Sequence, residues 1–171
     1  RQVQNGDLKN FVNQAYASVI AEAAHKEGSK IVVLSNSFSG KGLAPRIATK
    51  LQAGLADGVI ELPQISGDSL SVKKTAFSNK AFATVELSSA VKVISVNPNA
   101  YEAKAVGGSA AIEAFTPQLQ ATDLSTIVKE IVRATDKVSL PEAEIVVSAG
   151  RGLKGPENWG MVEDLANVLG A

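Results

Sequence analysis

The chain has 171 residues, of which 45% are hydrophobic, and its 17 basic and 17 acidic side chains cancel. A chain of this length and apolar content can bury a full core, whereas the balanced charge offers no net attraction to nucleic acid or to an anionic membrane. Cysteine is absent and histidine occurs once, as His25, which excludes disulfides and thiolate chemistry and gives poor support to metal centres and histidine-dependent catalysis.

The first predicted element is a helix over residues 7–27. Apolar residues recur there at three- and four-residue spacing, which is typical of a helix with one face against a core. Asp7 is the predicted N-terminal cap, and the helix should end near Gly28. His25 falls within this amphipathic stretch, so we expect it to be a partly exposed surface residue.

Strands and a second helix follow in alternation. KIVVL at 30–34 predicts a short buried strand, and a helix over 43–56 should have Pro45 in its first turn. GVIEL at 58–62 predicts the next strand. This order predicts a right-handed crossover and a mainly parallel sheet.

The loop at 35–42, between the first strand and the second helix, superficially resembles a phosphate-binding loop. Ser35 stands where a Walker A loop needs its first glycine, and Gly42 stands where the magnesium-binding hydroxyl should be. We therefore expect an ordinary strand-to-helix turn in which Gly40 provides backbone freedom.

From residue 67 to about 105 the predicted strands are short and closely spaced. LSVKKTAF, KAFATVEL and AVKVISV are rich in β-branched residues without helix-length segments between them, which favours hairpin or meander pairing. The range 123–138 is ambiguous, because its periodicity favours a helix and its β-branched content fits a strand. Pro141, within 139–144, is the best candidate for a domain boundary.

These elements predict an α/β fold. It should have three layers, with a mainly parallel sheet flanked by helices, as in Rossmann-like nucleotide-binding domains, and an antiparallel β-rich annex. Nothing in the chain assembles a catalytic set, so we predict neither catalytic residues nor metal ligands.

The motif with the clearest chemical meaning is G-x-G-x-x-G at 150–155. It follows a β-branched run predicted to be a strand, Ile145–Val147, and precedes a helix predicted to begin near Pro156. Glycine-rich backbone beside a helix N-terminus favours phosphate. A nicotinamide site also needs an acidic residue about twenty positions further on and relies on backbone amides, whereas Arg151 and Lys154 place two cations in this loop. Two interpretations of this chain therefore stay open. One is an NAD(P)-dependent Rossmann oxidoreductase domain that uses this loop, and the other is a non-catalytic α/β interaction module.

Two stretches resemble a known family. VVSAGRGLKGPENWGMVEDLANVLGA resembles the segment that opens the flavin domain in the alpha subunit of electron-transfer flavoproteins, and GLAPRIATKLQAGLADGVIEL resembles that family's L-A-P-R helix and the strand after it. The chain departs from the family at Gly42, often acidic, and at Gly155-Pro156, often Ser-Gly. The resemblance implies that 1–141 is the N-terminal α/β domain, incomplete at its N-terminus, and that 142–171 is the first strand, loop and helix of a truncated C-terminal FAD-binding domain.

The resemblance implies an electron carrier rather than an enzyme. In this family an alpha and a beta subunit form a heterodimer that holds one FAD and accepts electrons from flavin dehydrogenases, such as the acyl-CoA dehydrogenases of fatty acid β-oxidation. The electrons pass to a quinone oxidoreductase or the respiratory chain. We expect no nucleic-acid partner and no membrane insertion, and a location in the cytoplasm of a bacterium or in the mitochondrial matrix of a eukaryote.

By resemblance, Arg151 and Gly152 bind FAD in the complete heterodimer. A guanidinium in a glycine-rich turn suits a diphosphate or an electron-rich flavin ring, although Arg151 could instead be solvated or pair with Glu157. Lys154 is expected to be a surface cation, and Trp159 to pack beneath the loop. This chain alone is expected to bind no FAD.

Overall fold

The structure is a computed structural model that describes residues 1–132, 140 and 143–171. The chain divides into two compact units, Arg1–Ile131 and Val132–Ala171. The first unit contains the β-sheet with helices α1 (Asn13–Lys26) and α2 (Phe38–Leu51), and the second contains the glycine-rich loop and helix α3 (Gly160–Leu169).

Helix α1 (Asn13–Lys26) begins later than the sequence predicts. The prediction that Asp7 caps it is wrong, because the Asn5 side chain accepts the N–H of Asp7 and caps a separate 3-10 helix, η1 (Gly6–Leu8). The buried residues of α1 are small: Ala15, Ala17, Ala21 and Ala24. Small side chains let α2 approach closely, and α1 packs mainly on α2. His25 is exposed, as expected.

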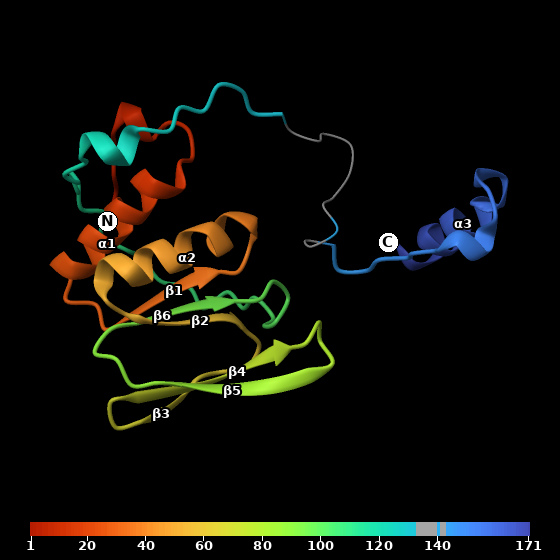
Figure 1. Ribbon diagram of the computed structural model, residues 1–171, viewed down its shortest axis with the longest axis horizontal. Helices are drawn as coiled ribbons and strands as arrows, with labels where there is room; N and C mark the ends of the chain where they lie inside the picture. The colour runs from red at the N-terminus through yellow and green to blue at the C-terminus, as the bar shows by residue number, and fades with distance from the viewer. Residues whose placement is uncertain (133–139, 141–142) are drawn as a thin grey trace. The chain divides into compact units, whose positions relative to one another are not determined.

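Helix α2 (Phe38–Leu51) covers the parallel strands, and both helices lie on the same side of the sheet (Figure 1). It begins earlier than predicted, because the Ser37 hydroxyl accepts the N–H of Gly40 and caps it. Pro45 therefore lies inside the helix rather than in its first turn. The helix also ends earlier than predicted, because Gln52 adopts the left-handed conformation, with φ of 50°.

The sheet is mixed. Its parallel strands are β1 (Ile31–Ser35), β6 (Lys92–Val96) and β2 (Gly54–Val59). Its antiparallel strands are β3 (Gln64–Ser66), β4 (Ser69–Ala76) and β5 (Ala81–Leu87). The order is β1-β6-β2-β4-β3, and β5 pairs with β4. The α/β fold, with a sheet flanked by helices and an antiparallel hairpin, is confirmed.

Strand β6 is the main correction within this sheet. AVKVISV was predicted to pair in an antiparallel meander, but β6 lies between β1 and β2 and is parallel to both. Its residues from Lys92 to Ser95 are all buried. Burial on both faces is typical of a central parallel strand, whereas the preceding LSVKKTAF and KAFATVEL form the predicted hairpin.

Two apolar clusters form the core of the first unit. One lies between the helices and the sheet and consists of Ala17, Leu43, Ala44, Ile47, Ala48 and Val93. The other lies within the curled sheet, between side chains of β2, β4, β5 and β6. It consists of Ala56, Val59, Leu70, Val72, Leu87 and Ile94. Strand β1 was predicted to be buried but is only half covered, because Ile31 and Val33 are 41% and 59% exposed.

Residues 97–132, which follow β6 in the described part of the chain, contain little regular structure. The sequence of 123–138 fits either a helix or a strand, and neither is formed in its described part, 123–132, which contains only the end of the 3-10 helix η2 (Ala121–Leu124). Three of its apolar residues, Ile127, Ile131 and Val132, are exposed and have no core to pack on. The remainder of that range lies outside the described residues, as does half of the predicted boundary at 139–144, including Pro141.

The strand predicted at Ile145–Val147 is also not formed. An isolated strand gains no ladder hydrogen bonds, and the described part of the second unit provides no neighbouring strand. Among the described residues, no helix is long and apolar enough to cross a bilayer.

Candidate functional site

The G-x-G-x-x-G loop folds as two single-turn 3-10 helices that lead into α3. They are η4 (Arg151–Leu153) and η5 (Pro156–Asn158), and α3 spans Gly160–Leu169. Lys154 joins the two turns with φ of 66°, a conformation uncommon outside glycine, and its N–H donates to the Arg151 carbonyl at 3.0 Å. The Asn158 amide donates to the Leu153 carbonyl at 2.8 Å and braces the turn. A helical start near Pro156 is confirmed, although its first turn is a 3-10 helix.

The glycines of this loop differ from Gly40 of the 35–42 loop in the space available for a side chain. At Gly40 an added Cβ would lie 1.7 Å from the Ser35 carbonyl oxygen, so packing within the first unit accounts for it. At Gly150 and Gly152 an added Cβ would meet nothing within 4 Å, and neither residue has a positive φ. Nothing in the described chain requires glycine at these two positions. Bare backbone facing open space permits a ligand to approach closely.

The loop and the start of α3 line a cavity of about 580 Å³. Arg151 and Lys154 are among its lining residues, and both are exposed. No ion pair forms between Arg151 and Glu157, or between Arg151 and any other described carboxylate. Trp159 was predicted to pack beneath the loop, but it is 42% exposed and lines the cavity. The described part of the second unit has too little core to bury it.

The backbone N–H groups of the loop fall into two sets. Those of Leu153, Lys154 and Gly155 donate to carbonyls within the loop. Those of Arg151 and Gly152 have no acceptor among the described residues. The guanidinium, the ammonium and these N–H groups are all donors, which is a set that suits an anion such as a diphosphate.

The carboxyl ends of the parallel strands are the other place where an α/β fold could bind a ligand. There Asn36 donates to Asn97 at 2.7 Å and accepts the Ser95 hydroxyl at 3.0 Å, while Ser95 accepts the Gly58 N–H at 3.2 Å. These polar groups bind one another and leave little for a ligand. The arrangement favours the ordinary turn predicted at 35–42.

Two family models match the chain. The electron transfer flavoprotein domain matches residues 2–120, and the electron transfer flavoprotein FAD-binding domain matches residues 139–171. The second match includes the whole glycine-rich loop.

Curated relatives carry corresponding names. Electron transfer flavoprotein subunit alpha of Bacillus subtilis is 33% identical over 167 residues, which cover 96% of this chain and 50% of the relative. The protein of the same name from Pseudomonas aeruginosa is 35% identical over 198 residues, 97% of this chain and 62% of the relative. Probable electron transfer flavoprotein subunit alpha, mitochondrial, of Caenorhabditis elegans is 30% identical, with 98% and 49% covered. This chain spans about half the length of most of these relatives. Because the first family model matches more than half of the chain, the chain belongs to the electron transfer flavoprotein family, and the relatives that it resembles are alpha subunits.

Proposed function

We propose that this chain is part of an electron carrier, the alpha subunit of an electron transfer flavoprotein, and that its glycine-rich loop contacts FAD. The observation that carries the proposal is the loop itself. Gly150 and Gly152 have open space where a Cβ would be, and Arg151 beside them has no ion-pair partner among the described residues. A loop with these properties is suited to a ligand that the chain does not itself supply.

Arg151 and Gly152 have separate roles in this proposal. Arg151 stays charged at every physiological pH and offers a planar fork of donors, which suits a diphosphate or an electron-rich ring. Gly152 lets the backbone approach the cofactor closely. FAD, when bound, supplies the redox chemistry, while the protein binds and orients it. The match of the FAD-binding domain to residues 139–171 favours FAD over a nicotinamide cofactor for this loop.

We assign residues 1–141 to the N-terminal domain of the subunit and residues 142–171 to the start of its FAD-binding domain. The two family matches, 2–120 and 139–171, support a boundary in this region. The chain then acts as a scaffold and a partial cofactor site, with no substrate turnover of its own.

The partners belong to the same proposal. A beta subunit completes the FAD site, flavin dehydrogenases of the acyl-CoA type donate electrons, and a quinone oxidoreductase or the respiratory chain accepts them. The names of the relatives support an alpha subunit that works with a counterpart. The location would be the bacterial cytoplasm or the mitochondrial matrix, according to the source.

The test is the absorption spectrum of the full-length subunit purified after coexpression with its beta subunit. We expect a yellow complex with flavin bands and about one FAD released per heterodimer on denaturation. The 171-residue chain alone, mixed with FAD and gel-filtered, should remain colourless. One loop arginine contributes only about 1.5–3 kcal/mol, against roughly 8 kcal/mol for micromolar binding.

Three results would contradict the proposal. A full-length complex that stays colourless with added FAD would favour a non-catalytic interaction module. Saturable binding of NAD(P) in place of FAD would favour the nicotinamide alternative. Stoichiometric FAD on the 171-residue chain alone would show that the binding site is placed wrongly.

A further inference from the structure

Residues 113–124 form a strap that follows the exposed stretch 101–112 of the first unit and lies along α1. At its start, the Phe115 N–H donates to the Gln2 carbonyl at 2.8 Å. The Phe115 side chain is 4% exposed, and the Lys26 ammonium lies 5.3 Å from the centre of its ring. The first part of the strap is therefore held by a backbone bridge and an aromatic anchor.

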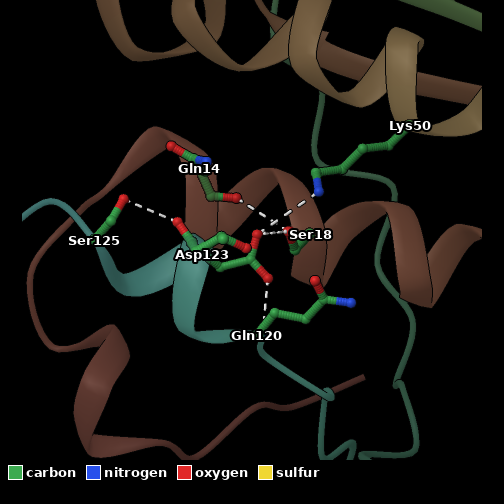
Figure 2. Close-up of polar contacts among 7 residues, drawn as sticks. Gln14, Ser18, Lys50, Gln120, Asp123 and Ser125 are labelled. Carbon is green, nitrogen blue, oxygen red and sulfur yellow. Dashed lines mark hydrogen bonds and ion pairs between the residues drawn. The ribbon is translucent and has the colours of Figure 1, made fainter.

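The end of the strap is held by a buried carboxylate (Figure 2). Asp123 is 6% exposed, and its Oδ1 accepts the Ser18 hydroxyl of α1 at 2.6 Å. Its Oδ2 accepts the backbone N–H of Gln120 at 3.0 Å. The Lys50 ammonium of α2 lies 3.7 Å from Oδ1, within ion-pair distance. One side chain thus ties the strap to both helices of the first unit.

We propose that Asp123 is a charge-dependent latch that locks the strap to α1 and α2 and so fixes where the chain leaves the first unit. Asp123 is the last buried residue described in that unit, since 124–131 are exposed or half-exposed. A buried carboxylate is stable only while it is ion-paired and hydrogen-bonded. Asp123 therefore stays buried and charged only in the closed state, in which the strap is packed on α1 and α2. The position of the latch therefore sets how many residues connect the packed part of the first unit, which ends at Asp123, to the glycine-rich loop.

The state of the latch depends on pH with a definite sign. Burial alone would raise the pKa of Asp123, but the hydrogen bonds from Ser18 and Gln120 and the charge of Lys50 outweigh it and hold the pKa below its usual 3.8. A folded-state pKa below the unfolded value means that the stabilisation is complete above the unfolded pKa and is lost as the pH falls through the folded one. The latch is therefore closed at neutral pH and opens only in acid.

Other charged groups also face the strap. Glu22 of α1 accepts the Gln118 N–H at 2.8 Å in an exposed contact, and Lys26 lies over Phe115. Because Glu22 is also a carboxylate, acidification alone cannot isolate the latch. Glu22→Gln is therefore the matched control, since it neutralises a carboxylate of α1 that holds the same strap through an exposed contact.

Hydrogen–deuterium exchange of the whole chain at neutral pH tests the latch. Asp123→Asn keeps the shape of the side chain, but it removes the charge and replaces one of the two acceptor oxygens with an amide donor. We expect amides of residues 116–124 to exchange at least tenfold faster in this variant, while those of β6 and α2 keep their wild-type rates. Glu22→Gln should change exchange in the strap by less than about twofold.

Wild-type exchange in the strap of Asp123→Asn would overturn the proposal, because the closed state would then not depend on charge. An equal rise in β6 would also overturn it, because Asp123 would then be an ordinary determinant of global stability. If Asp123→Asn does not fold, Lys50→Met serves as the test. Faster exchange confined to the strap supports the latch, and unchanged or uniformly faster exchange contradicts it.

Discussion

Arg151 is the residue on which the proposed cofactor contact depends most. If its guanidinium meets FAD, Arg151→Ala removes a charged donor, at a cost of about 1.5–3 kcal/mol, which corresponds to roughly ten- to more than hundredfold weaker binding. Arg151→Lys should restore only part of the affinity, because it keeps the charge without the planar fork of donors. The measurement is FAD dissociation from the complete heterodimer.

Lys154→Ala is the control for this series, since Lys154 lies in the same loop and is also exposed. It should hold FAD like the wild type. If Lys154→Ala loses FAD while Arg151→Ala retains it and transfers electrons normally, the wrong cation of the loop has been assigned.

Residue-level prediction succeeded where the signal was contiguous. The glycine-rich loop could be located because its spacing and the helical start near Pro156 lie within a few positions of one another. The contact between Ser18 and Asp123 joins residues 105 positions apart, and no local pattern connects them. The prediction for Trp159 was wrong because helical spacing leads to a buried face only where another element covers that face of the helix.

At the level of elements, β6 is the strand whose packing we expect to contribute most to the free energy of unfolding. Ile94 is 4% exposed in β6 and belongs to the apolar cluster enclosed by the curled sheet. Replacing a buried isoleucine with alanine leaves a cavity, so Ile94→Ala should lower the free energy of unfolding by about 2–5 kcal/mol. Urea titration monitored by circular dichroism measures this loss.

Ile65→Ala is the matched control, because Ile65 in β3 is the same residue type and is 73% exposed. It should stay within about 0.5 kcal/mol of the wild type. Similar losses for both variants would mean that β6 does not hold the central position in the sheet.

Element types were easier to predict than their partners. The sequence predicts strands at β1, β4, β5 and β6, but it does not say which neighbour each strand joins, and β6 was paired wrongly for this reason. Pro45 predicts the first turn of a helix because proline is favoured there, but the Ser37 cap begins α2 upstream of it. The run Ile145–Val147 has the composition of a strand without a partner in the described residues.

At the level of the whole molecule, the first unit should fold without the glycine-rich loop and α3. Both apolar clusters consist of residues before 131, and Val162 is the buried hydrophobic residue described in the second unit. Deletion from Arg151 onward should therefore leave the cooperative thermal transition in place, at nearly the same midpoint. Differential scanning calorimetry of the two chains measures it, and loss of the transition would show that the deleted residues belong to the same core.

The central position of β6 has a consequence for synthesis on the ribosome. Strands β1 and β2 each pair with β6 and lie on opposite sides of it, so the parallel part of the sheet stays open until Lys92–Val96 has emerged. The β4–β5 hairpin, by contrast, needs only neighbouring residues and can close first. While the ribosome translates the hairpin, the exposed edges of β1 and β2 are the surfaces on which a chaperone would act and at which aggregation would begin.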